Sequence, residues 1–80
     1  ASWWVEYSLE AANYLADNGE LVAALFFALE AMVEHDGWPQ IEVTELNAGL
    51  FAFEVEGHIV AFRRNQENAL VMVEVIKPLK

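Results

Sequence analysis

The chain has 80 residues, of which 56% are hydrophobic, and it carries a formal net charge of −9 and no cysteine. One domain over residues 1–80 is expected at this length, and a hydrophobic fraction above the roughly 45–50% of an average domain excludes intrinsic disorder. Disulfide and thiolate chemistry are excluded, and a soluble, cytoplasmic protein is expected, because no apolar run reaches the roughly 18–20 residues of a membrane span and no basic signal-peptide segment begins the chain.

The first residues predict a strand followed by a helix. Apolar residues alternate with others over residues 3–7, which is the period of a β-strand. Ser8 is expected to cap the helix that follows, with Glu10 in its first turn, where the helix dipole favours a negative charge. Asn18 and Gly19 are expected to end this helix in a left-handed conformation.

A second helix is expected to begin at Glu20 and to end before Gly37 and Pro39. Its apolar residues follow helical spacing, but residues 21–33 are apolar almost all round. A helix of this kind is mostly buried or forms half of an interface.

The remainder of the chain predicts β-structure. Residues 41–43 are expected to form a brief strand or an extended link, and a turn follows at residues 47–49. Glu56 and Gly57 indicate a two-residue hairpin turn. We therefore expect an α+β fold of order β-α-α-β-β-β, a two-layer sandwich in which a helical hairpin packs on a mainly antiparallel sheet. The expected long strands are residues 50–56, 58–64 and 69–77.

These segments, in this order, resemble the RelE/ParE superfamily of bacterial toxins from type II toxin–antitoxin systems. The resemblance covers nearly the whole chain through VEYSLEAANYLADNG, ELVAALFFALEAMVEHDGWP, TELNAGLFAFEVEGHIVAFRRN and LVMVEVIKPLK. It implies a toxin that an antitoxin neutralises by wrapping around it. Toxins of this kind act either as ribonucleases on mRNA in the ribosome or as poisons of DNA gyrase.

The residues that would support RNA cleavage depart from the family pattern. Asn47 stands where the family usually has lysine, Glu54 and Glu56 occupy an outward strand face that often bears arginine, and His58 replaces a frequent arginine. Phosphoryl transfer needs cations to stabilise the developing charge and groups for acid–base chemistry. Ribosome-dependent ribonuclease activity is implied by the resemblance, but we expect protein contacts to carry the function.

Four residues are candidates for catalysis, namely His58, Glu45, Arg63 and Lys77. His58 and Glu45 are expected to form an acid–base pair if the sheet brings them together, since only histidine titrates near neutral pH. Arg63 or Arg64 is expected to hold a phosphate, with Lys77 nearby, but only one of the two arginines can serve a given site, because neighbours in a strand point to opposite faces. The alternatives are a solvated histidine beside a turn and solubilising charges at a sheet edge.

No cofactor or metal is expected. The chain has no Gly-rich phosphate loop, nucleophile motif or dinucleotide fingerprint. Its two histidines, His35 and His58, do not have the spacing of a zinc site.

Charge and composition favour a protein partner. Residues 1–62 contain no lysine or arginine, while all four cations follow. This distribution argues against binding of free nucleic acid and favours an antitoxin or another basic protein, since complementary potentials speed association. The apolar excess also predicts a homo-oligomer or a partner interface. Two alternatives remain open: an acidic inhibitor that mimics nucleic acid, and a small oligomerising domain without chemistry.

Overall fold

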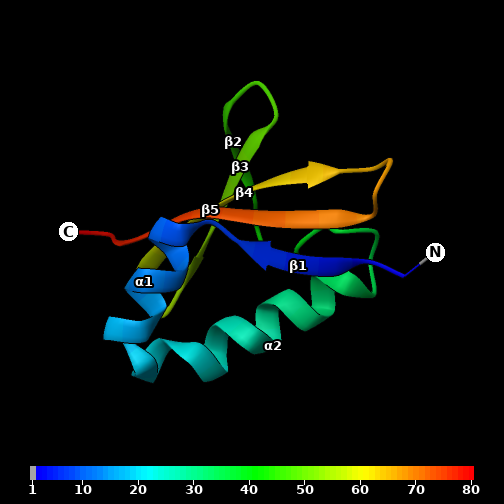
Figure 1. Cartoon of the computed structure of the whole chain (residues 1–80). Coiled ribbons are helices and arrows are strands. Elements are labelled where there is room, and N and C mark those ends of the chain that lie inside the picture. The colour runs from blue at the N-terminus through cyan, green and yellow to red at the C-terminus, as the bar shows by residue number, and fades with distance from the viewer. Residues whose placement is uncertain (1) are drawn as a thin grey trace.

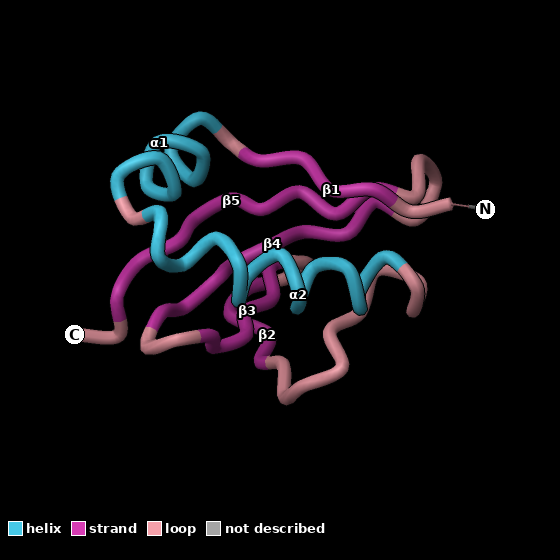
Figure 2. The backbone as a smooth tube through the Cα atoms, turned by 90° about the horizontal axis from the view of Figure 1, so that it is seen from below, coloured by secondary structure: helices cyan, strands magenta, loops and turns pink. Residues whose placement is uncertain are grey.

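The computed structural model describes residues 2–80, which form two layers, helices on one face of a five-stranded sheet. Both helices lie below the sheet in Figure 1, and Figure 2, which views the molecule from that side, shows α2 in front of the strands. Neither helix of the described chain is long and apolar enough to cross a membrane. The elements are β1 (Trp4–Tyr7), α1 (Leu9–Asp17), a 3-10 turn (Gly19–Leu21), α2 (Val22–Val33), β2 (Thr44–Asn47), β3 (Leu50–Val55), β4 (His58–Asn65) and β5 (Leu70–Pro78).

The sheet has the order β1-β5-β4-β3-β2, in which β1 and β5 are parallel and all other neighbours are antiparallel. The predicted α+β sandwich with a helical pair on a mainly antiparallel sheet is therefore confirmed. Residues 41–43 are the extended link and not the strand. The strand follows them as β2, because pairing begins where Thr44 faces Ala52 of β3.

The tight hairpin between β3 and β4 is also confirmed. Glu56 and Gly57 both have positive φ, at 49° and 72°, the conformation of a type I′ turn. The turn aligns Val55 with His58 and fixes the register of the hairpin. In the next pair of strands, Glu74 is an extra residue, because Ala61 faces Val75 while the following Phe62 faces Val73.

Ser8 caps α1 as predicted and also attaches it to the sheet. Its hydroxyl oxygen accepts from the Ala11 N–H at 3.0 Å and donates to the Glu74 carbonyl oxygen at 2.6 Å. The helix ends where predicted, but the left-handed ending is wrong. Asn18 has φ −136°, and its side-chain amide donates to the Tyr14 carbonyl at 2.8 Å. The chain then continues into the 3-10 turn, so no reversal is required.

Replacing Ser8 by alanine is expected to lower the free energy of unfolding by about 1–3 kcal/mol, because the substitution removes a helix cap and a hydrogen bond to β5. Urea denaturation measures the change. The exposed Ser2 is the matched control, and Ser2→Ala is expected to cost less than about 0.5 kcal/mol. Equal losses in the two variants would contradict the role of Ser8.

The hydrophobic core lies between the helices and the sheet. Residues from one face of β1, β3, β4 and β5 point into it, following the period of two, whereas all four residues of β2 are exposed. The buried positions of α2 recur at three- and four-residue spacing. This arrangement leaves the other face of the sheet, here called the open face, without a covering layer. The main core residues are Trp3, Leu21, Leu25, Leu29, Met32, Phe53, Val60, Phe62, Val71, Val73 and Ile76.

Candidate functional site

His58 is held between the β3–β4 turn and α1. Its Nδ1 lies 2.8 Å from the carbonyl oxygen of Glu56, and its Nε2 lies 2.8 Å from the hydroxyl of Tyr14. Because a carbonyl only accepts, Nδ1 donates to the Glu56 carbonyl, and the second hydrogen bond joins Nε2 to the Tyr14 hydroxyl. His58 thus joins α1 to the hairpin and uses both ring nitrogens within the chain.

Glu45 lies elsewhere and stabilises a turn. Its carboxylate accepts from the Gly49 N–H at 3.3 Å. Glu45 faces Phe51, whereas His58 faces Val55, and four strand residues span roughly 13 Å. The predicted acid–base pair of His58 and Glu45 is therefore not formed.

Arg63 and Lys77 share the open face but are not adjacent. Arg63 Nε lies 3.9 Å from a Glu74 carboxylate oxygen, with the two side chains 50% and 35% exposed. Lys77 is exposed and faces Ile59, which lies four residues, roughly 13 Å, before Arg63 along β4. The structure therefore places one cation beside a carboxylate and the other at a distance, and it does not gather them into a phosphate site.

Arg64 points to the helical face, opposite Arg63 as the alternation predicts. Its guanidinium carbon lies 4.8 Å from the ring centroid of Trp3 and 4.2 Å from that of Trp38. It donates to the Asp36 carbonyl from Nε at 3.1 Å and from Nη2 as well. Desolvation by this burial lowers the pKa of Arg64, while the Asp36 carboxylate opposes the shift. Arg64 therefore holds the end of α2 against the sheet.

A second feature is a group of large apolar side chains exposed on α2 and the neighbouring edge strand. Trp4 is 62%, Phe26 58% and Phe27 80% exposed. We call this group the α2–β1 surface. It borders a hollow of about 400 Å³ whose rim carries Glu30 and Glu34, and burial raises the pKa of the Tyr7 phenol beside it. The surface comprises Trp4, Tyr7 and Phe26, which line this hollow, together with Val22 and Phe27, which are exposed on the same helix.

β1 also offers its backbone. It is the terminal strand of the sheet and pairs only with β5. Trp4 donates its backbone N–H to the Ala69 carbonyl just before β5, and Ser8 donates to the Val73 carbonyl of β5. The alternate residues therefore direct their N–H groups away from the sheet. An unpaired edge of this kind is a template for strand addition by another chain.

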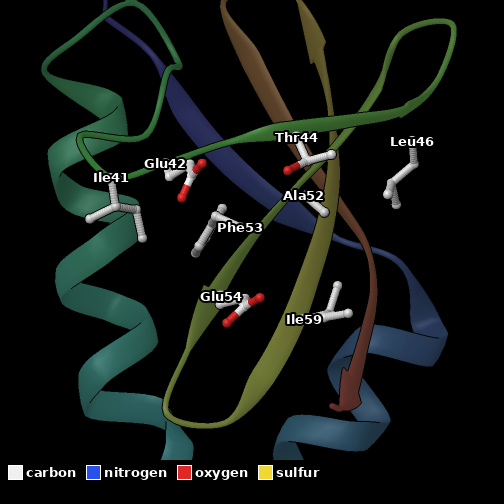
Figure 3. A pocket seen from close by; sticks show the side chains of 8 residues that line it. All are labelled: Ile41, Glu42, Thr44, Leu46, Ala52, Phe53, Glu54 and Ile59. Carbon is white, nitrogen blue, oxygen red and sulfur yellow. The ribbon is translucent and has the colours of Figure 1, made fainter.

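A third feature is a hollow of about 410 Å³ at the other edge of the sheet (Figure 3). It opens where the link before β2 separates from β3, and Ala52 leaves room on the open face beside it. Its walls are mostly apolar, and Glu42 and Glu54 are its only ionisable residues. We call it the β3 hollow. It is lined by Ile41, Glu42, Thr44, Leu46, Ala52, Phe53, Glu54 and Ile59.

The acidic residues form the surface of the molecule. Of the thirteen Asp and Glu residues, Glu74 is partly buried and the others are exposed. Within residues 2–80 the only ion pair is that of Arg63 with Glu74, and no three His, Cys, Asp or Glu side chains converge there on a metal-sized space. The surface is thus negative, and little of its charge is neutralised within residues 2–80.

The β3 hollow was not predicted from the sequence. Its residues are separated along the chain and meet only because β2 begins opposite Ala52. One signal was present, since the apolar Ile41 stands beside Glu42 in a segment without a clear period. The α2–β1 surface was better signalled by Phe26 and Phe27, which broaden the apolar stripe of α2.

The comparisons with known proteins concern the fold. No family model matches the sequence, and no curated protein shows significant similarity to it. Among solved structures, a chain of the toxin–antitoxin complex RelBE2 from Mycobacterium tuberculosis has a TM-score of 0.74 and 18% sequence identity, with 98% of this chain and 99% of that chain covered. The fold implied by the resemblance is therefore confirmed.

Proposed function

We propose that this protein is the toxin-like component of a toxin–antitoxin module and that it acts by binding another protein. The fold likeness to a chain of a toxin–antitoxin complex, over almost the full length of both chains, supports the choice of module. The observation that carries the proposal is the α2–β1 surface. Large aromatic side chains exposed together on a protein are typical of sites that another chain covers.

The form of the surface supports a partner protein. Trp4 and Tyr7 lie on a strand with a free edge, and Phe26 lies on the helix beside it, bordering the same hollow. A partner that adds a strand to β1 would form backbone hydrogen bonds and cover the aromatic side chains at the same time. The carboxylates of Glu30 and Glu34 at the rim favour a basic partner, because complementary charges steer association.

The open face supports protein binding over RNA cleavage. A ribonuclease needs unpaired cations close to the scissile phosphate, whereas Arg63 is paired with Glu74 and Lys77 is remote from it. His58, the candidate general base, points to the helical face and is bonded to Tyr14. Glu54 adds a negative charge where RNA would lie.

A second candidate function is inhibition of a basic protein by mimicry of nucleic acid. The observation that favours it is the density of exposed carboxylates, with one ion pair among the described residues. The two functions differ in the partner. An antitoxin is expected from a neighbouring reading frame, whereas the target of a mimic is a nucleic-acid-binding protein that DNA displaces.

The protein is expected to leave ribosome-bound mRNA intact, because its cations and its histidine do not converge on one site. The measurement is primer extension on mRNA incubated with ribosomes and the purified protein. The His58→Ala and Arg63→Ala variants are assayed beside it. Cleavage at codon spacing that is lost in both variants would overturn this prediction and restore the ribonuclease interpretation.

A further inference from the structure

We infer that the β3 hollow binds an arginine or lysine side chain from an extended, basic segment of the partner protein. This inference deepens the proposed function, on which it rests, by assigning the chemistry of the partner at a second position. The hollow lies at the β2–β3 edge of the sheet, and the α2–β1 surface lies at the opposite edge. A partner that contacts both would therefore extend around the molecule.

The first argument is the charge of the hollow. Glu42 and Glu54 are exposed, and neither carboxylate has a hydrogen-bond or ion-pair partner among residues 2–80. The nearest cation in the register is Lys77, which lies across from Ile59, itself across from Glu54. Two strand spacings amount to roughly 10 Å, so Lys77 leaves the negative charge of the hollow in place.

The second argument is the shape and polarity of the walls. Ile41 and Leu46 are each 50% exposed, and Phe53 and Ile59 continue the apolar lining. Arginine and lysine combine an apolar stem with a charged end and bury the stem along apolar surface. In Figure 3 the side chains of Glu42 and Glu54 extend from separate segments on either side of Phe53. The hollow thus offers apolar contact for a stem and two carboxylates for a cationic end.

The backbone of β3 beside the hollow has a free edge. β2 covers the edge of β3 only as far as Ala52, so Phe53–Val55 have no neighbouring strand on that side within the described chain. An extended segment can pair with this short free edge while one of its side chains enters the hollow. This feature selects a peptide segment over a free amine.

The same charges exclude the other occupants. A phosphate of RNA would meet Glu42 and Glu54 without a compensating cation. A second copy of the chain would bring a net charge of −9 next to a first copy that has the same charge. Exposed like charges oppose association. A basic protein segment meets neither obstacle.

The test is an NMR titration of the full-length, ¹⁵N-labelled protein with the blocked peptide Thr-Val-Arg-Val-Thr. Saturable shifts are expected for the backbone amides of residues 41–46, 52–54 and 59. The same peptide with citrulline in place of arginine keeps the shape and loses the charge. Its affinity is expected to be about five- to twentyfold lower, as is that of the original peptide for the Glu42→Gln, Glu54→Gln double variant.

The matched control removes two exposed carboxylates remote from the hollow. The Glu20→Gln, Glu67→Gln double variant is expected to bind the arginine peptide within about twofold of the unaltered protein, since distant surface charges are screened. The inference would be overturned if the citrulline peptide or free arginine amide bound as tightly as the arginine peptide. It would also be overturned if no shifts were saturable, or if the shifts were confined to the α2–β1 surface.

The proposed function is tested separately from this inference. The peptide probes the hollow without any toxin–antitoxin partner, whereas the proposed function depends on a partner at the α2–β1 surface. If the peptide does not bind but the partner complex forms, the inference about the β3 hollow is rejected and the proposed function is not. Peptide binding without any partner complex would reject the proposed function alone.

Discussion

Replacing Phe26 and Phe27 together by serine is expected to weaken binding of the partner by about a hundredfold or more, with little loss of stability. These side chains are 58% and 80% exposed, so the folded monomer gains little from them. Aromatic anchors at the centre of an interface commonly contribute about 2 kcal/mol or more each. Two such losses lower the affinity by at least about two orders of magnitude.

The measurement is calorimetric titration of each variant with the product of the adjacent reading frame. Leu79 offers a matched control, because it is also a large exposed apolar residue but lies outside the α2–β1 surface. Leu79→Ser is expected to bind within about threefold of the unaltered protein. If the phenylalanine double variant retains full affinity and remains folded, the partner does not use this surface.

Arg64→Ala is expected to lower the free energy of unfolding by about 2.5–3.5 kcal/mol, the largest stability effect expected for a charged residue of this chain. The substitution removes two cation–π contacts, with Trp3 and Trp38, and the hydrogen bonds to the Asp36 carbonyl. Each cation–π contact at a partly exposed position contributes about 0.5–1 kcal/mol, and a hydrogen bond to a charged group adds about 1.5 kcal/mol at the low end of its range.

Arg63→Ala is the matched control for Arg64→Ala. Its ion pair with Glu74 is long and half-exposed, and such pairs contribute about 0–1 kcal/mol. Arg64→Lys is expected to restore less than half of the loss, because lysine has no planar fork to stack between two rings and donate to one carbonyl. Equal losses at the two arginines, measured by urea denaturation, would show that Arg64 does not hold α2 against the sheet.

The contacts of Arg64 with Trp3 and with the Asp36 carbonyl require a glycine at position 37. Gly37 has φ +77°, and a Cβ at this position would lie 2.6 Å from the ring of Trp3. Only glycine combines the left-handed backbone with this close approach. The turn after α2 can therefore carry the Asp36 carbonyl to Arg64 while Trp3 packs beside it.

Local signals were sufficient for much of the fold. Ser8 was identifiable as a helix cap and Glu56-Gly57 as a two-residue turn, because each depends on neighbouring residues. β2 could not be identified from the sequence, because Thr44 and Glu45 form a strand only by pairing with Ala52 and Phe51 across an irregular turn. A four-residue strand that forms only by pairing with its neighbour shows no clear alternation of apolar and polar residues in the sequence.

The candidate site was harder to predict for the same reason. Alternation placed Arg63 and Arg64 on opposite faces correctly, but the role of Arg64 depends on Asp36, 28 residues away. The predicted pair of His58 and Glu45 failed because register, and not composition, decides which residues meet. His58 instead forms a hydrogen bond with Tyr14 of α1, which lies 44 residues earlier in the chain.

A basic protein partner is expected to bind this chain, guided by its acidic surface. The most direct test is the association rate of the purified protein with the product of the adjacent reading frame, measured by stopped-flow fluorescence between about 50 and 500 mM salt. A complex is expected at micromolar concentrations, and its association rate is expected to fall steeply as salt increases. Absence of a complex, or an association rate that stays constant or rises over this range, would contradict it.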